Sequence, residues 1–103
     1  MAAQKVLGGL DKTSAVTSEI QAIVRSLKPE VEEKIGRSLA VYHAISYRSQ
    51  VVAGTNYFVK VVVDDGDEYI HLRVFQPLPN SGDKLSLASY ETGKKLFDEI
   101  EYF

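Results

Sequence analysis

Gln50-Val51-Val52-Ala53-Gly54 runs directly into Thr55-Asn56-Tyr57-Phe58-Val59-Lys60-Val61. The second segment is rich in β-branched and aromatic residues, and residues 39–49 before the pentapeptide alternate between apolar and polar positions, so two strands flank residues 50–54. The pentapeptide is therefore predicted to form the tip of a β-hairpin. A turn that only faces solvent is usually polar, whereas this tip is apolar and ends in glycine. We expect it to make contact with a binding partner.

Alternation assigns the faces of the predicted strands. In residues 39–49 one face carries Leu39, Val41, His43, Ile45 and Tyr47. In residues 55–63 one face carries Tyr57, Val59, Val61 and Val63, and Lys60 is expected to mark a solvent-exposed opposite face. A further strand over residues 68–75 places Ile70, Leu72 and Val74 together, and residues 84–90 alternate in the same way.

Two turn-forming segments connect these strands. Asp64-Asp65-Gly66-Asp67 predicts a two-residue hairpin turn, because Asp-Gly tolerates the positive φ angles of a type I′ turn. Its acidic residues do not have the spacing of a calcium-binding loop, so no metal site is expected there. Residues 76–83 contain two prolines and predict a second projecting loop. Because antiparallel strands alternate in direction, this loop should leave the sheet beside the hairpin tip.

Residues 18–36 show helical periodicity. The apolar stripe consists of Ile20, Ile23, Val24, Leu27, Val31 and Ile35. Ser18 and Gln21 have the spacing of a capping box, and Gly36 is a natural end. Pro29 should kink or split this helix, and we favour a kinked single helix. The predicted fold is α+β, with one long N-terminal helix packed across a twisted antiparallel sheet of four to five strands.

Composition excludes several classes of function. A chain of 103 residues, 45% hydrophobic, is expected to form one domain over residues 1–103. A net charge of −2 without a basic block argues against nucleic-acid binding. No cysteine is present, so disulfides, thiolate metal sites and a cysteine nucleophile are excluded. The chain shows neither a signal peptide nor a membrane-spanning segment, which predicts a soluble, intracellular protein without membrane contact.

The sequence offers little for catalysis or for cofactor binding. It lacks the signatures of serine hydrolases, zinc proteases, phosphate-binding loops and dinucleotide-binding folds. His43 and His71 fall within predicted strands, where a single imidazole is usually a packed side chain. We therefore expect a binding protein that is not an enzyme and holds no cofactor or metal.

Four blocks together resemble the stefins, the small cytosolic type 1 branch of the cystatin superfamily of cysteine protease inhibitors. They are Gln50 to Tyr57, His71-Leu72-Arg73-Val74-Phe75, Leu78-Pro79 and Glu99-Ile100-Glu101-Tyr102-Phe103. The likeness covers nearly the whole chain. One departure is the N-terminal segment, which is longer than the usual stefin arm, so the register of that arm is open.

The resemblance implies a cytoplasmic, reversible, tight-binding competitive inhibitor of papain-like cysteine proteases such as the cathepsins. It further implies that residues 1–10 are a flexible inhibitory arm, and that the arm and two hairpin loops block the protease cleft. The protease-binding residues implied are Val6, Leu7, Gly8, Gly9, Gln50, Val51, Val52, Ala53, Gly54, Leu78 and Pro79. A monomer is expected. The alternative is a structural or assembly protein that acts through crosslinking or through a domain-swapped dimer formed by hairpin exchange.

Overall fold

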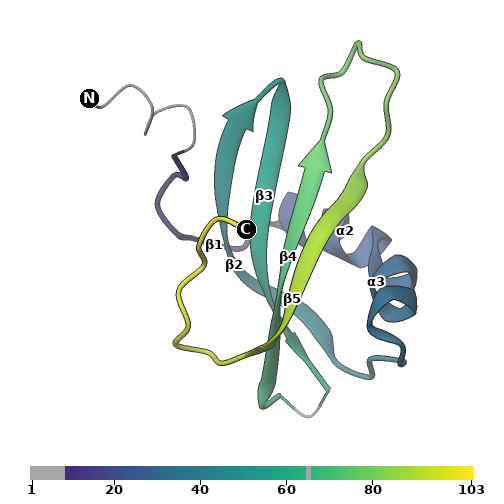
Figure 1. The fold of residues 1–103 in the computed structure, drawn as a ribbon, viewed down its shortest axis with the longest axis vertical. Helices are drawn as coiled ribbons and strands as arrows, with labels where there is room; N and C mark the ends of the chain where they lie inside the picture. The colour runs from purple at the N-terminus through teal and green to yellow at the C-terminus, as the bar shows by residue number, and fades with distance from the viewer. Residues whose placement is uncertain (1–8, 65) are drawn as a thin grey trace.

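A computed structural model of the chain describes residues 9–64 and 66–103. Its elements in order are β1 (Ser14–Ala15), α2 (Ser18–Ser26), α3 (Lys28–Ile35), β2 (Tyr42–Val52), β3 (Gly54–Val63), β4 (Glu68–Gln76) and β5 (Ser86–Lys94). The strands form one antiparallel sheet in the order β1-β2-β3-β4-β5. Figure 1 shows both helices on one face of the sheet and the C-terminal residues crossing the other. The predicted α+β architecture is confirmed, with β1 as a short fifth strand that the sequence pattern did not indicate.

The core lies between the helices and the sheet. The predicted helical stripe is buried or partly buried, and it packs against the faces of β3 and β4 that alternation had assigned to the core. Buried residues of the sheet in this cluster are Val59, Val61, Val63, Ile70, Leu72 and Val74. Within the described residues, no helix is long and apolar enough to cross a membrane.

The helical segment differs from the prediction at two points. Thr17, not Ser18, is the N-cap, and its hydroxyl accepts a hydrogen bond from the Ile20 backbone N–H. The predicted single helix is divided at Leu27 into α2 and α3, and Pro29 lies in the first turn of α3, where a missing N–H costs nothing. Gln21 takes no part in capping, and its side chain bonds the backbone of Ala44 on β2.

The face assignment of residues 41–45 was wrong because β2 contains a bulge. The pairing with β3 shifts between Ala44 and Ser46, which leaves Ile45 as an extra residue. An extra residue reverses the alternation, so Tyr42 and Ala44 are buried before the bulge while Tyr47 packs against the core after it. His43 and Ile45 are exposed.

The expectation that Lys60 marks a solvent face was also wrong. Residues 95–103, which we term the C-terminal strap, cover this face of the sheet (Figure 1). Lys60 is buried beneath the strap, and its ammonium donates to the backbone oxygens of Leu96 and Asp98. Phe58 on the same face is fully buried against the rings of Tyr102 and Phe103.

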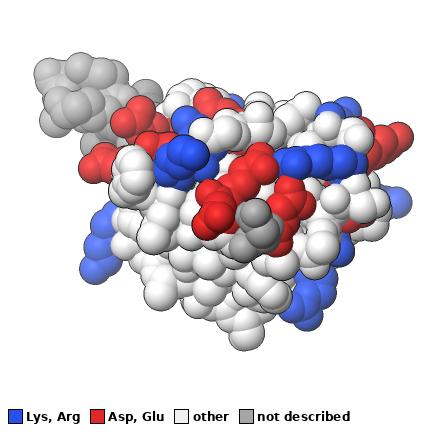
Figure 2. Space-filling model, turned by 90° about the horizontal axis from the view of Figure 1, so that it is seen from below, with Lys and Arg blue, Asp and Glu red and all other residues white. Residues whose placement is uncertain are grey.

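The turn between β3 and β4 is longer than predicted. Val63 pairs with Glu68, so the connection has four residues instead of two. Gly66 does adopt a positive φ of 92°. Arg37 forms ion pairs with Asp64 and Glu68 at 2.7 and 2.8 Å, and Figure 2 shows acidic side chains gathered at this end of the molecule.

Candidate functional site

The hairpin between β2 and β3 has an unusually short tip. Val52 pairs directly with Gly54, so Ala53 alone makes the turn. Val51 has 76% of its surface exposed, and Val52 and Ala53 are exposed as well. The tip, residues 50–54, therefore presents three small apolar side chains to solvent at the end of a paired and rigid hairpin, as the sequence predicted.

Gly54 fixes the tip against the neighbouring strand. Its φ is 120°, a backbone conformation that other residues rarely adopt. A Cβ atom at this position would lie 2.6 Å from the backbone oxygen of Gln76 and 2.9 Å from Cζ of Phe75. These separations are shorter than van der Waals contact, so only glycine lets the tip approach β4 this closely.

A buried polar pair lies directly behind the exposed tip. Gln50 and Asn56 are cross-strand partners, and the Asn56 side-chain Nδ2 donates to Gln50 Oε1 at 2.9 Å. Both side chains are buried, so the hydrogen bond is shielded from water. Through this contact Gln50 braces the two strands of the hairpin behind the tip. Asn56 was not among the predicted site residues, although its place opposite Gln50 could have indicated it.

The second loop, residues 77–85, lies beside the tip at the same end of the sheet (Figure 1). Leu78 is 53% exposed, and Pro79 is exposed next to it. The Leu78 carbonyl accepts hydrogen bonds from the backbone N–H and the hydroxyl of Ser81, which closes a tight turn. The sequence argument from strand direction is thus confirmed: Thr55 pairs with Gln76, so the two loops leave adjacent strands side by side.

Tyr57 ties the root of the second loop to β3. Its hydroxyl donates to Gln76 Oε1 at 3.3 Å, and its ring packs edge-on against Tyr47 with 6.0 Å between centroids. Burial raises the pKa of the Tyr57 phenol, with further contributions from Glu19 and Tyr47. The phenol therefore remains protonated at neutral pH and can donate this hydrogen bond.

Residues 9–11, which we term the arm base, are bound along the outer edge of β2. The Asp11 backbone N–H donates to the Ser49 carbonyl at 2.8 Å, and the Ser49 hydroxyl donates to the Asp11 carboxylate at 3.1 Å. Gly9 is exposed. Ser49 directly precedes Gln50, so the arm base reaches the end of the sheet where the tip begins. Val6, Leu7 and Gly8 lie outside the described residues.

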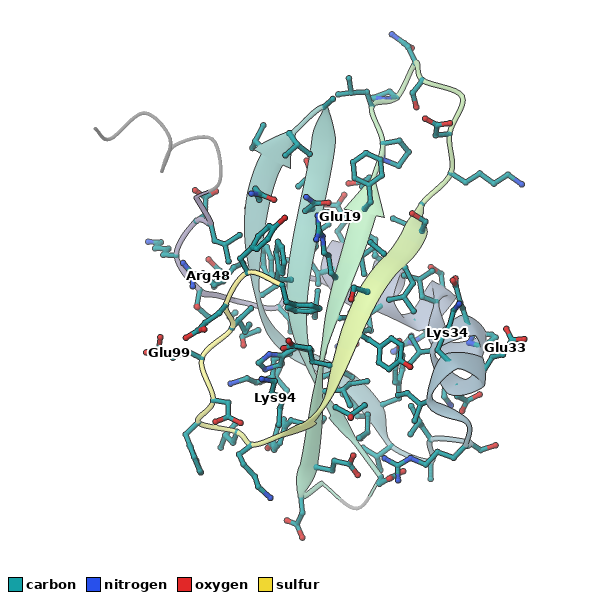
Figure 3. The ribbon with its side chains drawn as sticks, in the orientation of Figure 1. Glu19, Glu33, Lys34, Arg48, Lys94 and Glu99 are labelled. Atoms are coloured by element: carbon teal, nitrogen blue, oxygen red, sulfur yellow. The ribbon has the colours of Figure 1, made fainter. Side chains whose placement is uncertain are left out.

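Arg48 connects the arm base to the C-terminal strap. Its guanidinium donates to the carbonyls of Asp11 and Ile100, each at 2.7 Å, and to that of Leu10 at 3.4 Å. Figure 3 shows Arg48 between these two segments. Sequence reasoning gave Arg48 no role, because no local pattern indicates that residues 10–11 and 100 meet at this strand.

The two ends of the molecule differ in charge. The exposed residues of the tip, together with Leu78 and Pro79, carry no charge and form an apolar end, with the charged Asp83 and Lys84 further along the second loop. Asp64, Asp67 and Glu68 lie at the opposite end. Across the described residues, no group of histidine, cysteine and acidic side chains has the arrangement of a metal site. The apolar end is therefore suited to contact with a macromolecular surface.

The sequence was compared with known families and proteins. The family model described as the cystatin domain matches residues 8–96. The chain is similar to Stefin-C of Bos taurus, with 46% identity over 97 residues that cover 94% of this chain and 95% of that protein. It is 47% identical to Cystatin-B of Sus scrofa over 96 residues, which cover 93% of this chain and 97% of the relative.

A third relative and a solved structure agree with these matches. Leukocyte cysteine proteinase inhibitor 1 of Sus scrofa is 46% identical over 100 residues, covering 97% of this chain and 96% of that protein. Among solved structures, a secreted type 1 cystatin from Fasciola hepatica superimposes with a TM-score of 0.70 at 26% identity. That superposition covers 84% of this chain and 96% of the other.

Proposed function

The chain belongs to the stefins, the type 1 members of the cystatin family, and from this membership we propose that it inhibits papain-like cysteine proteases, including cathepsins. Inhibition is reversible, tight and competitive in this proposal, and the chain carries out no catalysis of its own. The observation that carries it is the apolar end of the molecule, where Val51, Val52 and Leu78 are exposed side by side on two adjoining loops. A cysteine proteinase inhibitor among the relatives supports the class of target.

The shape of the apolar end supports a wedge that enters the protease cleft. A tip with a single turn residue is narrow, and a β-hairpin does not present an extended peptide to the catalytic thiolate. Val51, Val52 and Ala53 fill the cleft and exclude water, while Leu78 and Pro79 contact its primed side. Gly54 sets the position of the tip, and Gln50 acts as a brace behind it.

Preorganisation supports tight binding. A standard protein interface of about 800 Å² per partner is compatible with nanomolar affinity, about −12 kcal/mol, when little entropy is lost on ordering. The tip is held by the Gly54 contact, by the Gln50–Asn56 hydrogen bond and by the pairing of β3 with β4, which begins at Thr55 directly after the tip. The wedge therefore needs little rearrangement before it docks.

The N-terminal segment completes the proposal. Residues 1–10 act as an inhibitory arm, in which Val6, Leu7, Gly8 and Gly9 bind the non-primed side of the cleft. The attachment of Asp11 to Ser49 supports this role, because it holds the arm base beside the tip. We also propose a cytoplasmic location, as the stefin family implies, which fractionation of expressing cells can check.

Titration of active papain with the purified chain tests the proposal. We expect a stoichiometric, one-to-one loss of activity, competition with substrate, and recovery of the uncleaved chain from the complex. Size-exclusion chromatography of the same sample should show the monomeric chain as the active species. Loss of activity that requires a dimer, or progressive cleavage of the chain, would contradict the proposal.

A pair of substitutions locates the binding surface. Val51→Asp places a charge on an apolar residue that the complex buries, and losing that burial costs about 1.5–3 kcal/mol, at least a tenfold weaker inhibition. Phe97→Asp is the matched control, because Phe97 is 82% exposed but follows the far end of β5, away from the tip. Equal inhibition by the two variants would place the contact surface elsewhere.

A further inference from the structure

His71 is a buried titratable group that the proposed inhibitor mechanism does not use. It lies on β4 with 1% of its surface exposed, and its Nε2 atom has no hydrogen-bond partner among the described residues. A neutral imidazole tolerates this, because one ring nitrogen then carries no proton. A protonated imidazole has an N–H on both nitrogens, so protonation would bury an unpaired donor.

The C-terminal strap covers His71. Lys60 is the direct cross-strand partner of His71 on β3 and therefore lies on the same face of the sheet. The Lys60 ammonium donates to the strap carbonyls of Leu96 and Asp98, which places the strap over this part of the sheet. With the strap in this position, His71 has only 1% of its surface exposed to water.

Cationic side chains from three adjacent strands hold the strap. Besides Lys60 on β3, Arg48 on β2 donates to the Ile100 carbonyl at 2.7 Å, and Arg73 on β4 donates to the Phe103 carbonyl at 2.8 Å. All of these bonds end on backbone oxygens of a segment that has no regular secondary structure. The strap is thus attached by side chains alone and can open without breaking the strand pairing of the sheet.

The charges around His71 come from β3, β5 and the strap. Lys60 faces it from β3, Lys94 and Glu91 face it from β5, and Asp98 faces it from the strap. The pKa of His71 is lowered to about 4, mainly by burial and also by Lys94 and Lys60, while the two carboxylates act in the opposite direction. The imidazole is therefore neutral beneath the closed strap at neutral pH.

We propose that the C-terminal strap is an acid-releasable cover, in which protonation of His71 favours the open strap because only there can water pair the new N–H. Opening exposes Phe58 and the face of the sheet on which Lys60 and His71 lie. The proposal concerns the sheet face opposite the helices and does not depend on protease inhibition.

The size of the effect follows from the two protonation equilibria. With a pKa of about 4 for the closed state and 6.5 for a solvated histidine, the equilibrium constant for strap opening rises about 30-fold between pH 8 and pH 5. Little change is expected above pH 7, since neither state is then protonated.

Thiol labelling measures this opening, because the chain contains no cysteine. Ile100→Cys places a thiol at a strap position that is 2% exposed, so a disulfide reagent that reacts under acidic conditions labels it only when the strap opens. Phe97→Cys provides the exposed reference on the same segment and corrects for the pH dependence of thiol reactivity. We expect the ratio of the two labelling rates to rise about 30-fold from pH 8 to pH 5.

Histidine variants test whether His71 causes the rise in the labelling ratio at low pH. Adding His71→Gln, or His71→Phe should the first variant fail to fold, is expected to remove the rise in the labelling ratio. Adding His43→Gln, which changes the exposed histidine of β2, should leave the rise intact. A constant ratio in the His71-containing protein, or an equal rise in both His71 variants, would overturn the proposal.

Discussion

Replacing Gly54 with alanine tests whether the position of the tip controls inhibition. The added Cβ would have to move by about 0.8 Å to bring its 2.6 Å separation from the Gln76 oxygen up to the 3.4 Å at which ordinary van der Waals contact begins. The φ of 120° adds backbone strain, and together these effects cost about 1–3 kcal/mol. A domain of this kind has about 5–15 kcal/mol of stability, so the variant should still fold.

The tip of the Gly54→Ala variant should shift away from β4, and with it Val51 and Val52 should leave the positions in which they fit the cleft. We expect inhibition of papain to weaken at least tenfold, or about 1.4 kcal/mol, as measured by the inhibition constant. Urea unfolding of the same sample reports the loss of stability separately.

Gly66→Ala is the matched control. Gly66 also has a positive φ, of 92°, but a Cβ added there would meet no atom of the described residues within 4 Å, and Gly66 lies at the opposite end of the sheet. This variant should lose stability through strain and inhibit papain as well as the unaltered chain does. If a folded Gly54→Ala variant kept full inhibition, or if Gly66→Ala were equally impaired, the reasoning from tip geometry would fail.

Three further substitutions, with Lys34→Met as a control, test the contacts that hold the fold. Lys60→Met removes two charge-assisted hydrogen bonds to the strap, so it should lower the free energy of unfolding, measured in urea, by about 1.5–3 kcal/mol. Lys34→Met is the control, because Lys34 is exposed in the last turn of α3, and this variant should lose less than about 1 kcal/mol. Tyr57→Phe removes the hydrogen bond to Gln76 and should cost about 0.5–1.5 kcal/mol; an unchanged unfolding midpoint would show that this bond does not stabilise the second loop. Because the pKa of His71 lies below 6.5 in the folded state, the unfolded chain takes up a proton first as the pH falls, so the contribution of His71 to stability is lost between about pH 6.5 and pH 4. Between pH 7 and pH 4, the free energy of unfolding measured in urea should fall by about 3 kcal/mol more in the unaltered chain than in His71→Gln. An equal fall in both proteins would contradict this assignment.

The sequence predicted those features that depend on neighbours along the chain. The helical stripe from Ile20 to Ile35 and the core face of β4 follow from hydrophobic periodicity, because the same residues must be buried whichever element covers them. The adjacency of the tip and the second loop follows from strand direction alone. Each of these inferences needs only the period of a segment or the order of the strands.

The predictions that failed depend on contacts between distant segments or on a shift of one residue. The bulge at Ile45 reversed the faces of β2. Next to this bulge, the backbone N–H of Ala44 donates to the side chain of Gln21 on α2, a contact between segments that are distant in the sequence. The N-cap of α2 is Thr17, one residue before the predicted Ser18, and the local sequence pattern does not resolve a shift of one residue. In each case a single residue changes the result, whereas periodicity is an average over many.

Consecutive residues were enough to indicate an antiparallel sheet, an amphipathic helical segment and an apolar hairpin tip, since period and turn chemistry are local properties of the chain. The burial of Lys60 and His71, and the link that Arg48 makes between the arm base and the strap, came to light only in the folded molecule. The physical reason is that alternation states which side chains share a face of a strand, while burial of that face depends on whether residues 95–103 fold back across it.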